Sequence, residues 1–244
     1  MGDKVALIFG YGPHVGVEVA KAFATHGYEV AVVSRSDNCS DSAKGYLQIT
    51  ADLSDPSSVG AIFTKVIEEL GHPSVVVYNA SALSLNPSSA LEQQISNFQS
   101  DNNVNIVSAY IAAQLAIHSF ALLPSVSSRT FIYTGNKLPF MVVQPLLAQG
   151  VGKAGAAHLI HYLAEEYKDR DYKFYFADER KPDGNPVYTA IDGSAHAEFY
   201  IQLSEDKTQG PWNATFVKGQ GYIPFPETVV QDAVVMDQEV PNIE

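Results

Sequence analysis

Residues 5–16 read VALIFGYGPHVG, an apolar run that leads directly into a glycine-rich turn. A strand buried inside a parallel sheet has this near-continuous apolar composition. Glycines let the next turn bend tightly and bring its backbone close to a helix N-terminus, where N–H groups and the macrodipole favour a phosphate. Gly10, Gly12 and Gly16 therefore predict a strand, a phosphate-binding turn and a helix. Their spacing is one residue longer than the G-x-G-x-x-G dinucleotide fingerprint, so a tight turn without a ligand is the alternative.

The alternation of strands and helices continues along the chain. Further strands are predicted at residues 28–33, 46–50, 75–78, 130–133, 172–176 and 215–217, and helices at 14–26, from Pro56, and at 104–123, 145–168 and 191–203. Residues 178–186 are predicted to form a polar loop. This order is typical of a single-domain α/β Rossmann fold, with a doubly wound, mainly parallel sheet and helices on both faces. We expect the domain to span residues 1–226 and the acidic residues 227–244 to form a tail.

The composition narrows the possible partners. The 244 residues carry a formal net charge of −12, which argues against a nucleic-acid or anionic-membrane surface. Cys39 is the only cysteine, so no internal disulfide can form. Residues 104–123 are apolar, but polar side chains interrupt them, which favours a buried helix over a membrane span. With no secretory leader recognised, we expect a cytoplasmic protein with a small-molecule substrate.

The end of the second predicted strand bears on the choice of cofactor. In dinucleotide folds an acidic residue here binds the ribose 2′-hydroxyl, whereas an arginine accommodates a 2′-phosphate. Arg35 occupies this position and predicts NADP(H). Asp37 lies two residues further on and keeps NAD as the alternative.

Five short motifs follow one another in order along these elements. They are the glycine turn, Asp52-Leu53 after the third strand, Asn79-Ala80 after the fourth, Asn105 in the next helix, and Lys153 before a small-residue stretch. Together they resemble the short-chain dehydrogenases/reductases over roughly residues 4–168. The resemblance implies that the first three motifs and Lys153 bind the cofactor, and that Asn105 and Lys153 belong to the catalytic machinery.

Other positions depart from the family pattern. His14 stands where the family has its central turn glycine, and Ser81 replaces a glycine after Asn79-Ala80. The family's catalytic tyrosine and serine fall on Gln149 and Asn136. A tyrosine hydroxyl can exchange a proton, whereas an amide can only form hydrogen bonds. The resemblance thus indicates a divergent member that lacks the catalytic tyrosine and serine.

Replacement acids and metal ligands are further candidates. Tyr133 and Lys137 flank Asn136 and could supply a proton, or could simply pack in the sheet and face solvent, respectively. His161 and Glu165 share one helix face, but no further ligands are indicated, so no metal site is predicted.

The leading hypothesis is an atypical NADP(H)-binding oxidoreductase that acts on a small organic substrate. One alternative is a redox-inactive cofactor-binding or sensing protein. Another is a non-redox cyclase, isomerase or lyase that uses Asn136 and Gln149 in the same pocket. The excess apolar and small residues of helices 104–123 and 145–168 predict a homodimer or homotetramer, as the resemblance also implies.

Overall fold

A single eight-stranded sheet organises the residues described in this computed structural model, which are 4–36, 43–85, 89 and 92–226. The strand order is β3-β2-β1-β4-β5-β6-β7-β8, and every neighbouring pair is parallel except β7 with β8. The strands are Val5–Phe9 (β1), Glu29–Ser34 (β2), Leu47–Thr50 (β3), Val75–Tyr78 (β4), Thr130–Thr134 (β5), Lys173–Glu179 (β6), Asn213–Val217 (β7) and Gly221–Tyr222 (β8). The predicted α/β fold with a doubly wound, mainly parallel sheet is confirmed.

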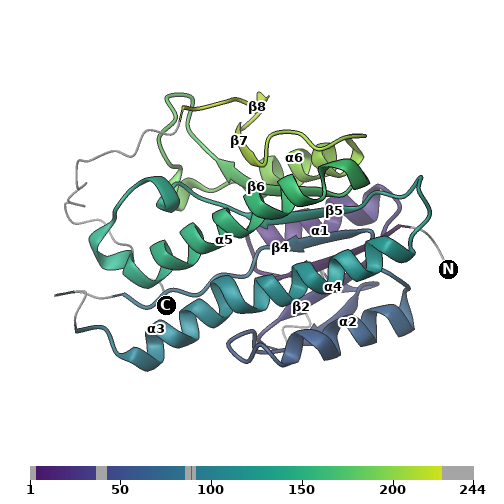
Figure 1. Cartoon of the computed structure of the whole chain (residues 1–244), viewed down its shortest axis with the longest axis horizontal. Coiled ribbons are helices and arrows are strands. Elements are labelled where there is room, and N and C mark those ends of the chain that lie inside the picture. The colour runs from purple at the N-terminus through teal and green to yellow at the C-terminus, as the bar shows by residue number, and fades with distance from the viewer. Residues whose placement is uncertain (1–3, 37–42, 86–88, 90–91, 227–244) are drawn as a thin grey trace.

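Helices cover both faces of the sheet (Figure 1), with α2, α4 and α5 on one face and α1 and α6 on the other. The α-helices are Val15–Thr25 (α1), Ser58–Glu69 (α2), Ile95–Asn102 (α3), Ser108–Leu122 (α4), Leu147–Glu166 (α5) and Gly193–Glu205 (α6). A π-helical turn, Asn103–Val107 (η3), joins α3 to α4. Short 3₁₀ turns occur at Leu138–Phe140 (η4), Gln144–Leu146 (η5), Lys168–Arg170 (η6) and Tyr188–Ala190 (η7).

The two layers explain why β1 has a continuous apolar sequence. Val5, Leu7 and Phe9 pack into the core beneath α2, α4 and α5, whereas Ala6 and Ile8 pack beneath α1 and α6. Successive strand residues point to opposite faces, and here both faces are buried. No position in β1 can therefore be polar without entering one core or the other.

The helix predicted at residues 104–123 is longer than expected. It begins at Ile95 and continues through α3, η3 and α4 to Leu122. Its length and composition would allow it to cross a membrane, yet half of its most apolar window is buried inside the molecule. Alanines such as Ala109, Ala112 and Ala116 form the buried face of α4. A core helix of a single domain has these properties.

The end of β6, the start of α2 and the last strand also differ from the sequence-based expectation. β6 continues through Glu179, so Asp178 and Glu179 belong to the strand and not to the predicted polar loop. Both carboxylates are buried, which an alternation of apolar residues does not indicate. The two-residue strand β8 was not predicted, and α2 begins two residues after Pro56. The predicted tail, residues 227–244, lies outside the described residues.

Helix α6 is held at both of its ends. At its C-terminus the buried Lys173 ammonium donates hydrogen bonds to the carbonyl oxygens of Leu203 (3.0 Å), Ser204 (2.8 Å) and Asp206. At its N-terminus a Cβ added to Gly193 would lie 2.3 Å from the carbonyl oxygen of His14. Only glycine permits this approach, and it places the start of α6 directly against the glycine turn.

Candidate active site

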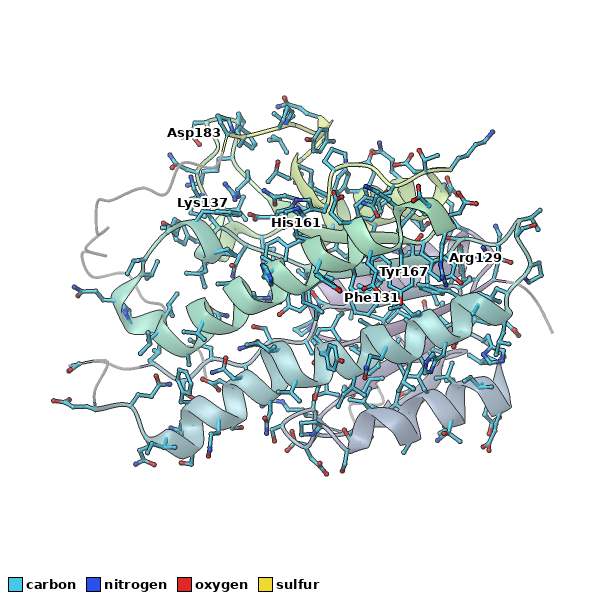
Figure 2. The ribbon with its side chains drawn as sticks, in the orientation of Figure 1. Arg129, Phe131, Lys137, His161, Tyr167 and Asp183 are labelled. Atoms are coloured by element: carbon cyan, nitrogen blue, oxygen red, sulfur yellow. The ribbon has the colours of Figure 1, made fainter. Side chains whose placement is uncertain are left out.

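The functional candidates gather at the carboxyl ends of the parallel strands. Figure 2 shows Arg129, just before β5, and Lys137, just after β5, at opposite ends of the molecule. Lys137 lies beside the loop that contains Asp183, which follows β6 (Figure 2). Ligands of open α/β sheets bind at this carboxyl edge, where the strand order reverses.

The glycine turn is packed too closely to accept other residues at two positions. Gly10 has φ +85°, and an added Cβ would lie 2.5 Å from the backbone nitrogen of Ala80. A Cβ on Gly16 would lie 2.6 Å from the carbonyl oxygen of Gly10, and Asn79 Nδ2 donates a 2.8 Å hydrogen bond to that oxygen. The structure therefore brings the glycine motif and the Asn79-Ala80 motif into direct contact.

The outer side of the turn is open. A Cβ on Gly12 would have no neighbour within 4 Å, and His14, the N-cap of α1, makes no capping hydrogen bond with its side chain. The first N–H groups of a helix, together with its macrodipole, form a natural site for a phosphate. This cradle fits the pyrophosphate of a dinucleotide.

Arg35 and Asp52 lie at the ends of the neighbouring strands β2 and β3. Hydrogen bonds from Ser54, followed by the positive charge of Arg35, lower the pKa of the Asp52 carboxyl. Arg35 is exposed and Leu53 is buried, with its carbonyl oxygen bound by the Ser108 hydroxyl at 2.7 Å. The structure thus brings together the residues expected around the adenosine end of a cofactor. Asp37, on which the NAD alternative depends, lies outside the described residues.

A cavity of about 560 Å³ opens beside the turn, between the ends of β4, β5 and β6 and the start of α5. Its apolar wall includes Leu83, Leu138, Met141 and Leu146. Its polar groups are Asn79, Ser81, Thr134, Asn136, Lys137, Gln149, Lys153, Asp178, Glu179, Tyr188, Thr189 and His196. This mixture of an apolar wall and a few converging polar groups is typical of a small-molecule site.

Lys153 is the most deeply buried cation of this cavity, with 4% of its surface exposed. Its Nζ donates a 2.8 Å hydrogen bond to the carbonyl oxygen of Thr134 and lies 4.6 Å from the centre of the Tyr133 ring. Burial lowers the pKa of Lys153 to about 7, and the negative charge of Asp178 partly opposes this effect. The ammonium group can therefore release and regain a proton near neutral pH.

Gln149 lies one helical turn before Lys153 on α5. Its Nε2 donates a 3.2 Å hydrogen bond to Ser81 Oγ, which in turn donates to Asn105 Oδ1 at 3.1 Å. Asn105 is fully buried in the π-helical turn. Asn136 also lines the cavity, and its Oδ1 accepts a 3.1 Å hydrogen bond from the Leu138 backbone nitrogen.

Tyr133 and Lys137, the two replacement acids considered from the sequence, both donate hydrogen bonds to backbone carbonyl oxygens. Tyr133 is fully buried, does not line the cavity, and donates its hydroxyl to the carbonyl oxygen of Asn105 at 2.9 Å. Burial raises the pKa of Tyr133, so this hydroxyl is a poor acid. Lys137 does line the cavity, and its Nζ donates to the carbonyl oxygen of Gly184 at 3.0 Å. It is thus half-buried against a loop and not simply solvated.

Comparison with known proteins gives the family. The family model described as short chain dehydrogenase matches residues 4–174. Short chain dehydrogenase/reductase dmxR12 from Cryptosporiopsis sp. (strain 8999) is 43% identical over 239 residues, which covers 93% of this chain and 96% of that protein. The chain is a short-chain dehydrogenase/reductase.

Two further members of the short-chain dehydrogenase/reductase family show lower sequence identity to this chain. Short chain dehydrogenase/reductase nsrO from Aspergillus novofumigatus (strain IBT 16806) is 28% identical over 196 residues, covering 75% of this chain and 61% of that protein. A crystal structure of a metagenomic short-chain oxidoreductase in complex with NADP has a TM-score of 0.76 over 88% of this chain and 96% of that chain. At 17% identity this likeness supports the shared fold.

Sequence reasoning missed several polar groups of this short-chain dehydrogenase/reductase. Glu179 accepts a 2.8 Å hydrogen bond from the backbone nitrogen of Asp192, and burial raises its pKa. The buried His196 donates from Nδ1 to the carbonyl oxygen of Asp192 at 2.8 Å, and burial lowers its pKa to about 4. No sequence motif identifies Glu179 and His196 as site residues. They reach the cavity only because β6 extends to Glu179 and because α6 begins beside it.

Tyr188 was missed for a similar reason. It reaches the cavity from the short turn η7 and adopts φ +50°, a left-handed conformation that non-glycine residues rarely take. The histidine and glutamate considered as metal ligands lie elsewhere, on α5, where the His161 ring stacks on Trp212 at 4.4 Å.

Proposed function

We propose that this protein is an NADP(H)-dependent oxidoreductase that acts on a small organic substrate. One cavity carries the proposal: Asn79, which binds the carbonyl oxygen of Gly10 in the glycine turn, lines it together with Lys153 and Gln149. A dinucleotide cradle thus adjoins a site large enough for a small molecule. When bound, the nicotinamide would donate a hydride to the substrate or accept one from it.

The residues of this chain have distinct proposed roles. Gly10, Gly12, His14 and Gly16 would hold the pyrophosphate, Asp52 and Leu53 the adenine, and Arg35 the 2′-phosphate. Lys153 would bind the nicotinamide ribose. The short-chain oxidoreductase solved with NADP supports the choice of cofactor by analogy of fold.

The proposed reaction is atypical because two family positions carry amides. Neither Gln149 nor Asn136 can titrate near neutral pH, whereas a positioned general acid contributes roughly 10² to 10⁴ in rate. We therefore expect cofactor binding with little turnover of simple ketones and aldehydes. Because these two amides cannot supply a proton, two alternatives remain. One is a redox-inactive sensor, and the other is a non-redox cyclase, isomerase or lyase.

Calorimetry and product analysis test this proposal. NADPH should bind, and its consumption with one of a panel of carbonyl compounds would support an oxidoreductase. Product formation without NADPH consumption would indicate a non-redox enzyme, and binding without any product would indicate a sensor. Failure of both NADPH and NADH to bind would contradict a cofactor-dependent function.

We also propose that the protein is a homodimer or homotetramer. Large apolar side chains are exposed along η3 and α4 at Val107, Tyr110 and Leu122, and along α5 at Val151 and Tyr162. Exposed apolar surface of this kind favours association. Light scattering at micromolar concentration should give at least twice the monomer mass of 26.4 kDa, and a monomer would contradict the assembly.

A further inference from the structure

Two departures from the family pattern contact each other in the cavity. Gln149 stands at the position of the family tyrosine and Ser81 at that of a glycine, and the two side chains form a 3.2 Å hydrogen bond. They lie 68 residues apart in the chain, on α5 and after β4. The contact links both departures to a single hydrogen-bond network.

The direction of this network is fixed by the backbone of Ala82. Its N–H can only donate, and it lies 3.0 Å from Asn105 Oδ1. Its carbonyl can only accept, and it lies 2.9 Å from Asn105 Nδ2. The orientation of the Asn105 amide therefore has one solution, with Oδ1 toward Ser81.

Asn105 then determines the roles of Ser81 and Gln149. Because Oδ1 only accepts, the Ser81 hydroxyl must use its single proton for the 3.1 Å bond to Asn105. Ser81 Oγ can then only accept a hydrogen bond from Gln149, which must present Nε2 to it. Within the described residues Gln149 Oε1 has no hydrogen-bond partner, so a carbonyl oxygen is left for the cavity.

We propose that Gln149 binds a hydroxyl group of the substrate through Oε1, and that Ser81 is the positioning residue that sets this polarity. The second Nε2 hydrogen suits a carbonyl oxygen next to that hydroxyl, so the favoured ligand class is a hydroxy ketone. This rests on the proposed function, because it takes the cavity as the substrate site. A family tyrosine would instead present one hydroxyl that both donates and accepts.

The apolar wall of the cavity makes ligand affinity depend on whether the ligand donates a hydrogen bond to Gln149 Oε1. Leu138 and Met141 line the same cavity as Gln149, so a ligand that fills this cavity would displace water from Gln149. A ligand without a donor leaves Oε1 unsatisfied, and displacing water without replacing its hydrogen bonds weakens binding. We expect a preference of roughly tenfold for the hydroxylated ligand.

Three matched aromatic probes test the preference. Benzoin carries a hydroxyl beside its ketone, deoxybenzoin lacks that hydroxyl, and benzoin methyl ether blocks it. Dissociation constants are measured by calorimetry in the presence of redox-inert tetrahydro-NADP. Benzoin should bind about tenfold more tightly than either analogue.

The variants separate positioning from structure. Gln149→Met, which has no donor and only a weak acceptor in its thioether, should remove most of the preference. Ser81→Ala should reduce it, while Ser81→Thr, which keeps the hydroxyl, should retain it. Gln202→Met changes an exposed glutamine of α6 outside the cavity and is the matched control, with the preference unchanged. Affinity for tetrahydro-NADP should be the same in all five proteins.

A second measurement needs no ligand. In protein with ¹⁵N-labelled glutamine, the Gln149 side-chain amide signals, assigned by their loss in Gln149→Met, should move in Ser81→Ala. Unmoved signals would overturn the hydrogen-bond network. Benzoin binding no better than deoxybenzoin, whether both bind or neither does, would overturn the ligand class while leaving cofactor binding intact. If the unmodified protein does not bind tetrahydro-NADP, the proposed function itself would be contradicted.

Discussion

The two halves of the candidate site differ in what holds them together. The half around β1, β2 and β3 is built from backbone, since Gly10 and Gly16 allow contacts that any Cβ would block. The half around β5, β6 and α5 is built from side chains, among them Gln149, Lys153 and Glu179. Backbone geometry limits what can be substituted in the first half, whereas single side chains decide the chemistry of the second. A family member can therefore keep its cofactor cradle while its reaction centre changes.

Introducing the tyrosine and serine that the resemblance implies at positions 149 and 136 should change the second half most. Gln149→Tyr with Asn136→Ser should raise NADPH-dependent reduction of simple ketones by about 10² or more, because it adds a general acid. NADPH consumption measures the effect, and each single substitution is a control. Brisk reduction of simple ketones by the unmodified protein would contradict the argument and would point to a different acid in the cavity, such as Lys153 with its pKa of about 7.

Substitutions in the glycine turn test the backbone half. Gly10→Ala should destabilise the protein by about 2 kcal/mol or more, because of its positive φ and the contact with Ala80. Gly12→Ala is the matched control and should leave urea unfolding nearly unchanged, since its Cβ meets open space. If Gly12→Ala weakens NADPH binding without changing stability, a phosphate lies against Gly12. Equal free energies of unfolding for the two variants would contradict the claim that a Cβ clashes at Gly10 but not at Gly12.

Lys153, in the half around β5, β6 and α5, should make the free energy of unfolding depend on pH. The folded protein gives Lys153 a pKa of about 7, whereas an unfolded lysine has a pKa of about 10.4. Between these values the unfolded chain holds a proton that the native state has released, so Lys153 destabilises the protein less as pH rises. Lys153→Met should therefore be stabilising at pH 7, and its advantage should shrink by on the order of 2 kcal/mol by pH 9. Urea unfolding of the cofactor-free proteins measures this, and a constant difference would contradict the assigned pKa.

Arg35 should give the smallest effect, on cofactor choice alone. A charge-assisted contact with the 2′-phosphate is worth about tenfold in affinity, so NADPH should bind more tightly than NADH. Arg35→Ala should narrow this difference without altering NADH binding. Calorimetry that gives the same affinity for both cofactors in the unmodified protein would show that Arg35 does not select the phosphate.

Much of the first half could be predicted from the sequence because its determinants are local. The apolar run of β1, the glycines and Asn79-Ala80 each indicate their own conformation, and the register of parallel strands brings them together. Apolar periodicity likewise located every strand except β8, a two-residue pair with no periodicity to detect.

The second half could not be predicted because its determinants are distant in the chain. Nothing near Ser81 indicates that it meets Gln149, and Asp178 with Glu179 looked like loop because buried carboxylates contradict the usual composition of a strand. The π-helical turn also has no sequence mark, yet it leaves the carbonyl oxygens of Val104 and Asn105 to the hydroxyls of Tyr78 and Tyr133. These two tyrosines therefore act as structural hydrogen-bond donors.

Helix α6 connects the two ends of the parallel strands. Its C-terminus is bound at the amino end of β6, and its N-terminus contacts the glycine turn at the carboxyl end of the sheet. Its thirteen residues span about 20 Å, from the carbonyl oxygens bound by Lys173 to the contact between Gly193 and His14. These contacts at both ends oppose movement of α6 along its axis, and together with the hydrogen bond from Asn79 to Gly10 they hold the glycine turn in place. The turn is preorganised: a ligand arriving there does not have to order it, and none of its binding energy is diverted to that task.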